Sequence, residues 1–157
     1  MSNNINRGLA GTDVQHTYIF ENSAWKCEGV YYQGEQAVPM EGMSYCLRDK
    51  AQWKVHNIMK VSLSPPLRFI NNYDITIEKS TGLIRCISEN EQFGRLEGMI
   101  TVTGKTILLG WESKEGYHGQ EILTQCENGS YHMVSVTSMP LPDVLPKYEA
   151  VLQRRWC

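Results

Sequence analysis

The stretch that decides the fold is RLEGMITVTGKTILLGWES, residues 95–113. Apolar or small residues alternate with polar or mixed ones in both of its halves, and Thr103-Gly104-Lys105 separates the two halves as a turn. The alternating positions are Leu96, Gly98, Ile100 and Val102 before the turn and Ile107, Leu109 and Trp111 after it. Because side chains of a strand point to opposite faces in turn, this pattern predicts a β-hairpin.

The same alternation continues through most of the chain, with turn residues at intervals of about 8 to 12 positions. Ser80-Thr81-Gly82 and the segment at 127–130 mark two further turns. The predicted strands are residues 16–20, 24–32, 43–47, 53–62, 67–77, 83–88, 96–103, 106–113, 119–126 and 130–137, with one more near 147–155. We therefore predict an all-β fold, an antiparallel up-and-down β-barrel of about eight to ten strands.

The two ends of the chain behave differently from its middle. Residues 1–14 are polar and lack periodicity, which predicts a flexible arm before a single barrel domain over 15–157. Residues 147–155 fit both a helical stripe and a strand face, so either element is possible. A closing strand is favoured because it would join the last edge of the sheet to the first.

The charge and the composition of the chain restrict the kinds of partner and the cellular location that we expect. The 157 residues carry a net charge of −2, without a cluster of like charges, and this disfavours nucleic-acid and membrane partners. The chain shows neither a secretory signal nor a long apolar span, so we expect a soluble, cytoplasmic protein. Its five cysteines are widely spaced, and we expect buried, reduced thiols, with Cys157 exposed at the terminus.

In its length and in the rhythm of its predicted strands over roughly residues 16–156, the chain resembles the calycin superfamily, which contains the lipocalin-like and fatty-acid-binding-like barrels. Trp25 lies on an early strand, and Arg154 and Arg155 lie near the end of the chain. In lipocalins a tryptophan of the first strand packs against an arginine of the last, so the resemblance implies such a contact here. The chain departs from the lipocalin pattern at Ser23, where that pattern has glycine, and it shows no helical lid after the first strand.

A barrel of this class would enclose a ligand among large aromatic side chains. The predicted walls of the ligand site are Trp25, Trp53, Tyr73, Trp111 and Tyr131. Asn57 shares one strand face with four apolar residues, so it would be buried and would orient the polar end of a ligand. Asn71 and Tyr73 are similar polar positions on the next predicted strand.

For catalysis the densest constellation is KEGYHGQE, residues 114–121, which contains His118 and Glu121. A histidine can transfer protons near neutral pH, and Tyr73, on another predicted strand, is a further candidate. The sequence HGQEILTQ has no clean apolar face, so Glu121 could be buried or exposed. The chain contains no motif for a metal, a phosphate loop or a hydrolase nucleophile, and we expect no cofactor.

Two functions therefore stay open, beside a third option, which is an interaction protein with a filled barrel and no cavity. The first is a barrel that binds a small, largely apolar ligand, aromatic or acyl, in its interior. The second is a small barrel enzyme, such as a cyclase, isomerase or lyase, that uses the same cavity with His118, Glu121 and Tyr73 as acid and base groups. A buried carboxylate with a raised pKa beside a histidine or tyrosine would favour the enzyme. The oligomeric state is open.

Four Glu-Gly pairs, each followed by an apolar or aromatic residue, recur along the chain. Gly29, Gly42 and Gly98 fall within or at the start of predicted strands, which indicates bends in the sheet rather than parts of a site. The fourth glycine, Gly116, falls between strands, where the mouth of a barrel would be.

Overall fold

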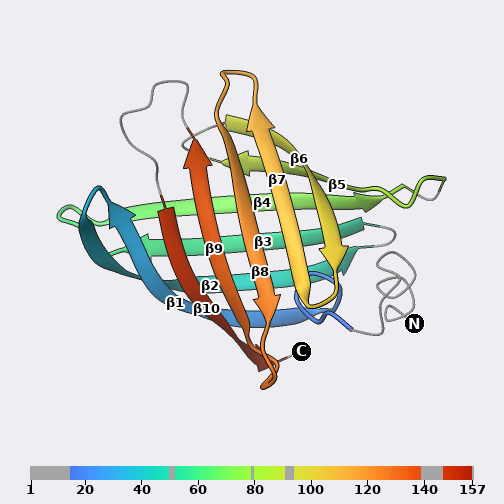
Figure 1. Cartoon of the computed structure of the whole chain (residues 1–157), viewed down its shortest axis with the longest axis horizontal. Coiled ribbons are helices and arrows are strands. Elements are labelled where there is room, and N and C mark those ends of the chain that lie inside the picture. The colour runs from blue at the N-terminus through green and yellow to red at the C-terminus, as the bar shows by residue number, and fades with distance from the viewer. Residues whose placement is uncertain (1–14, 50–51, 79, 91–93, 139–146, 157) are drawn as a thin grey trace.

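A computed structural model describes residues 15–49, 52–78, 80–90, 94–138 and 147–156. Within these ranges every regular element is a β-strand (Figure 1), so this part of the chain contains no helix able to cross a membrane. The ten strands are β1 (Ser23–Gln33), β2 (Gln36–Asp49), β3 (Gln52–Val61), β4 (Leu67–Ile77), β5 (Ile84–Asn90), β6 (Gly94–Thr103), β7 (Thr106–Ser113), β8 (His118–Gln125), β9 (Tyr131–Ser138) and β10 (Lys147–Trp156). The predicted arm over 1–14 and Cys157 lie outside the described residues.

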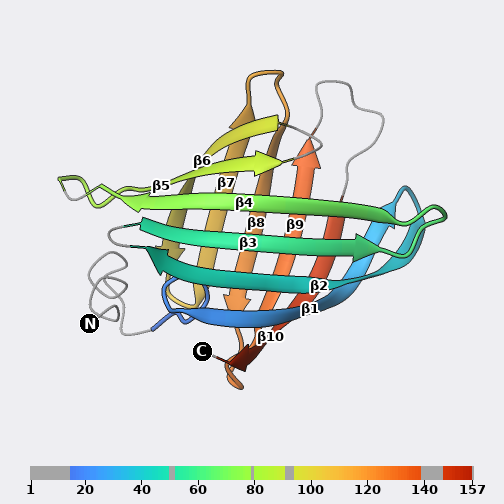
Figure 2. The ribbon, with the colours of Figure 1, turned by 180° about the vertical axis from the view of Figure 1, so that it is seen from behind.

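Each strand pairs antiparallel with its neighbour in the chain, and β10 pairs with β1 to close the barrel. The predicted up-and-down barrel is therefore confirmed. Strands β2–β4 form one wall, and β7–β9 cross it at a steep angle on the opposite wall, as Figure 2 shows from behind. The hairpin at residues 95–113 is β6 and β7, in which Ile100 is opposite Leu109.

The ambiguous segment at 147–155 is a strand. β10 lies between β1 and β9, with Leu152 opposite Cys27 on one side and Tyr131 on the other. The prediction of a closing strand is confirmed, and the helical alternative is wrong. Closure satisfies the backbone groups that two free edges would expose.

The alternating faces point as the pattern predicts. On β3, Trp53, Val55, Asn57, Met59 and Val61 are all buried. The apolar core fills much of the barrel and draws on every strand, with Cys27, Cys46 and Cys86 among its free, buried thiols.

Residues 15–22 close one end of the barrel and do not form the strand expected at 16–20. They turn instead, with Ile19 at a φ of 75°. His16 Nε2 donates to the Gly104 carbonyl oxygen (2.7 Å), which leaves its Nδ1 to accept from the Tyr131 hydroxyl (2.9 Å). The Phe20 ring packs edge-on against Trp53, at 6.5 Å between ring centroids. These tertiary contacts outweigh the local alternation that predicts a strand, and we call residues 15–22 the plug.

Three of the repeated glycines lie where strands approach closely. A Cβ on Gly29, Gly42 or Gly98 would overlap the backbone of the adjacent strand, in β10, β3 and β7 respectively. The structural interpretation of these glycines is therefore supported. Gly116 lies in the β7–β8 turn with a φ of 95°, a conformation that suits glycine.

Candidate functional site

A cavity lies in the barrel interior, at the end opposite the plug. Its volume is about 50 Å³, which is room for a few water molecules or for one end of a small ligand. Tyr31, Trp111 and Tyr148 of its wall are only partly buried, so this end of the interior reaches solvent. The full lining is Tyr31, Phe69, Asn71, Tyr73, Leu96, Trp111, Glu121, Ser135, Thr137 and Tyr148.

Glu121 is the buried acid of this cavity. It points inward from β8, and the Tyr73 hydroxyl on β4 donates a hydrogen bond to its Oε1 at 3.3 Å. The Tyr148 hydroxyl on β10 also bonds Glu121, and Ser135 on β9 bonds Tyr148. Burial raises the pKa of the Glu121 carboxyl from 4.5 to about 7, although the two phenol hydrogen bonds act to lower it.

A second, smaller cavity lies on the plug side of Glu121. It has a volume of about 20 Å³, and Tyr18, Asn57, Tyr73, Cys86 and Glu121 contribute to its wall. Asn57 Oδ1 is buried and has no hydrogen-bond partner within the described ranges. This cavity can hold about one water molecule, which such an acceptor favours.

The other titratable groups around Glu121 keep their protons at neutral pH. Burial raises the pKa values of the Tyr18, Tyr73 and Tyr148 phenols well above 10. It also raises the pKa values of the Cys27 and Cys86 thiols to about 12. Among the described lining residues of both cavities, Glu121 is the only Asp, Glu, Lys, Arg or His. The interior charge therefore changes near pH 7 at one carboxyl.

The structure brings Glu121 and Tyr73 together but leaves His118 apart from them. His118 is exposed, and its Nδ1 lies 3.4 Å from the Gly116 carbonyl oxygen. An odd separation along a strand puts two side chains on opposite faces, so His118 and Glu121 point to the outside and the inside of β8. His118 is thus not part of the interior site, and the grouping predicted from residues 114–121 is corrected.

Of the predicted ligand walls, Tyr73 and Trp111 line the larger cavity, and Asn57 lines the smaller one. Trp25, Trp53 and Tyr131 instead pack against other side chains at the plug end. There they are core, because the plug occupies the space that a ligand would need.

The contact that the lipocalin resemblance implies is present. The Arg154 guanidinium carbon lies 6.0 Å from the centroid of the Trp25 ring. Trp25 Nε1 donates to the Ser23 hydroxyl at 2.8 Å, so the residue that departs from the lipocalin pattern satisfies the indole.

Sequence reasoning missed the residues that complete the site. Tyr31, Phe69 and Tyr148 bring three of the five aromatic rings around the larger cavity, and Ser135 bonds Tyr148. Tyr148 falls on both the helical stripe and the strand face of residues 147–155, and only the strand places it opposite Ser135 at the cavity.

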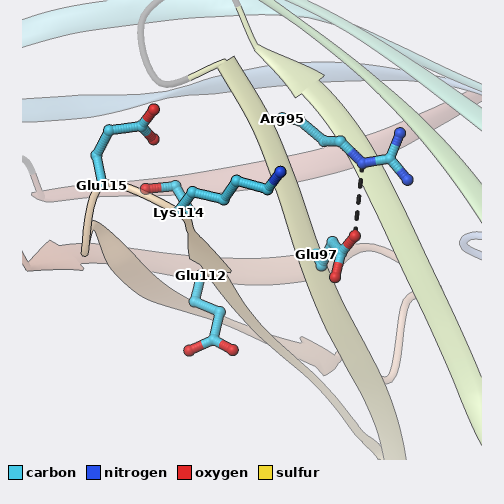
Figure 3. A pocket seen from close by; sticks show the side chains of 6 residues that line it. Arg95, Glu97, Glu112, Lys114 and Glu115 are labelled. Atoms are coloured by element: carbon cyan, nitrogen blue, oxygen red, sulfur yellow. Dashed lines mark ion pairs between the residues drawn. The ribbon is translucent and has the colours of Figure 1, made fainter.

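A separate hollow lies on the outer face beside the β7–β8 turn (Figure 3). It has a volume of about 270 Å³ and is lined by exposed charged side chains, among them Lys114 and Glu115. Arg95 Nε and Glu97 Oε1 form an ion pair across part of it, 3.5 Å apart. It offers no buried polar group, so the interior cavity is the better candidate although it is smaller.

In the part of the chain that the structure describes, no three His, Cys, Asp or Glu side chains are close enough together to bind a metal ion. In comparisons with known proteins, no family model matches this chain, and no curated protein matches it. The closed ten-strand antiparallel barrel is consistent with a calycin-like fold.

Proposed function

We propose that this barrel binds a small molecule at the solvent-reaching end of its interior. The single observation that carries the proposal is the convergence of Tyr73 and Tyr148 on a buried Glu121 at the wall of an aromatic cavity. Concave, mostly apolar sites with a few convergent polar groups are the usual form of small-molecule sites. The predicted cytoplasmic location and the absence of nucleic-acid and membrane partners stay predictions.

The size of the cavity limits what can bind. At about 50 Å³ it encloses only one end of a small molecule, so the remainder would lie between Tyr31, Trp111 and Tyr148 toward solvent. A long acyl chain does not fit inside, because the plug and the core occupy the other end. This favours the aromatic half of the predicted ligand class.

The chain offers its own reporter for a binding test. Trp111 lines the cavity, whereas Trp25 and Trp53 are buried at the plug end. In an NMR titration with benzyl alcohol, the indole N–H signal of Trp111 should shift in a saturable way, while those of Trp25 and Trp53 stay in place. A Trp111→Phe variant assigns the signal. An unmoved Trp111 signal, or shifts confined to indole signals other than that of Trp111, would contradict the proposal.

A second candidate function is proton transfer, and a specific observation favours it. Burial raises the pKa of Glu121 to about 7, and its carboxylate accepts a hydrogen bond from a tyrosine, an arrangement that favours an enzyme. The carboxylate would take a proton from a carbon next to a carbonyl and return it to the same or another carbon. Once Glu121 carries the proton, the O–H groups of Tyr73 and Tyr148, which donate to its carboxylate beforehand, would donate to the new oxyanion instead.

Hydrogen–deuterium exchange at the methyl group of acetophenone tests this step without knowledge of the true substrate. The protein should accelerate exchange in D2O, with a rate that rises as pH passes through about 7. Glu121→Gln should abolish the acceleration and Tyr73→Phe should lower it, while Glu41→Gln, on the exposed face of β2, leaves it unchanged. Equal exchange with wild type and Glu121→Gln would exclude Glu121 as the base for this class of ketone.

A further inference from the structure

We propose that the interior site is selective for an organic cation, an ammonium group that lies against the Glu121 carboxylate within the ring of aromatic side chains. The inference rests on the proposed binding function and adds the charge of the ligand to it. It follows from three features of the cavity: its charge, its walls and the hydrogen bonds around its acid.

The charge of the cavity has one sign. Within the described ranges, the side chains that line both cavities include a single carboxyl, Glu121, and no lysine, arginine or histidine. A ligand with a carboxylate, such as a free fatty acid, would meet a like charge and find no cation there. Like charges in a poorly solvated site disfavour binding, whereas a cation would neutralise the buried carboxylate.

The walls suit a cation as well. Five aromatic residues surround the cavity, and the rings of Phe69 and Tyr148 have centroids 6.0 Å apart. Aromatic faces carry negative electrostatic potential and attract ammonium groups, and cages of several rings are a known form of recognition site for them. Trp111, the aromatic side chain with the strongest such attraction, is among the five.

The hydrogen bonds prepare the acid to be charged. Tyr73 and Tyr148 both donate toward Glu121, and a carboxylate offers about four acceptor positions, so positions are left for an N–H group. Donors from two strands hold the carboxylate in place without neutralising it. A positive charge at the remaining acceptor positions would complete this arrangement.

The pH dependence then has a defined sign. The titratable groups that face Glu121 are Tyr18, Tyr73, Tyr148, Cys27 and Cys86, and burial raises the pKa of each, so none loses its proton near pH 7. A cation binds the ionised carboxylate, so its affinity should fall as pH drops below about 7. Between pH 8 and pH 5 the ionised fraction of Glu121 falls about 100-fold, which sets the largest loss of affinity expected.

The test uses three probes of matched size: benzylammonium, benzyl alcohol and benzoate. Their dissociation constants are measured from the Trp111 indole shift at pH 5, 6, 7 and 8. At pH 8 benzylammonium should bind at least about tenfold more tightly than benzyl alcohol, and benzoate should bind more weakly than both. Only benzylammonium should lose affinity strongly on acidification.

Variants distinguish the effect of the Glu121 carboxylate on binding from the effect of charges elsewhere on the protein. Glu121→Gln should remove the preference for benzylammonium and its pH dependence but keep benzyl alcohol binding, whereas Glu41→Gln changes neither. Tyr73→Phe removes a donor to the carboxylate, so the midpoint of the pH dependence should move to higher pH. If Glu121→Gln fails to fold, the wild-type pH series with three probes still decides the question.

The failures can be told apart. If benzyl alcohol binds as well as benzylammonium at pH 8, or if benzylammonium binds more tightly on acidification, the inference about charge is overturned while the binding site stands. If no probe moves the Trp111 signal at any pH, both the site and its cation selectivity are overturned.

Discussion

Replacing Glu121 by glutamine should change how the stability of the fold depends on pH. Burial raises the pKa of this carboxyl from 4.5 to about 7, so the folded state holds a proton that the unfolded chain releases between these values. Below pH 4.5 both states are protonated, and Glu121 costs nothing. As pH rises to 7 the folded state loses stability, because a factor of ten in proton affinity corresponds to about 1.4 kcal/mol. Above pH 7 the cost reaches about 3 kcal/mol.

The assay is urea unfolding of wild type and Glu121→Gln at intervals from pH 4.5 to 8.5. Glutamine has nearly the same shape and stays neutral, so other titrating groups cancel in the difference between the two proteins. The free energy of unfolding of Glu121→Gln relative to wild type should rise by about 3 kcal/mol from the acid to the alkaline end. Glu41→Gln removes an exposed carboxylate and controls for the net charge.

The reasoning is refuted if the difference between Glu121→Gln and wild type stays constant within about 0.5 kcal/mol, the range of ordinary surface substitutions. The reasoning is also refuted if the free energy of unfolding of Glu121→Gln relative to wild type falls as pH rises, because the folded state would then favour the charged carboxylate.

Three further predictions concern the rest of the barrel. Gly29→Val should destabilise the fold by at least about 2 kcal/mol in urea unfolding or prevent folding, because no Cβ fits against β10, whereas Gly110→Ala, with open space around it, should change the urea midpoint little. Tyr131→Phe should loosen the plug, since its hydroxyl bonds His16 and a backbone N–H, and should cost about 1–3 kcal/mol with faster amide exchange over residues 15–22; unchanged exchange would contradict this. With the C-terminal cysteine replaced by serine, a thiol reagent at pH 8 should modify the exposed Cys126 alone in the native protein, because burial raises the pKa values of the other three thiols to about 11 or 12.

The barrel itself was predictable because its signal is local. Period-two alternation places each side chain inside or outside without knowledge of its neighbours, and this holds for β3, where Asn57 is buried among apolar residues. Residues 16–20 alternate in the same way but form the plug, because His16 and Tyr18 find partners on distant strands. Such contacts have no signature within a window of a few residues.

The site was predictable only in part, for the same reason. Glu121 lies on the same strand face as Gly119. Glycine has no side chain, so its presence does not indicate whether that face is buried or exposed. Gly119 is inward because it is opposite Trp111, whose ring covers it so closely that a Cβ would lie 2.6 Å from Cε2. The register that pairs these two residues is a property of the assembled sheet. The inward position of Tyr148 could not be predicted for a similar reason, because the residues that share its face depend on whether β10 is a strand or a helix.

A purely structural role does not explain why residue 121 is an ionisable glutamate and not a neutral glutamine. Its hydrogen bonds join β4, β8 and β10 through Tyr73 and Tyr148, and the side-chain oxygen of a glutamine could accept from the same phenols. Glutamine would keep this network and avoid the cost of a buried ionisable group above pH 4.5. What only the carboxyl supplies is a negative charge, or a proton to exchange, at the wall of a cavity that reaches solvent. If Glu121→Gln is more stable than wild type at pH 8 but no longer prefers a cation or transfers a proton, Glu121 serves function and not the stability of the fold.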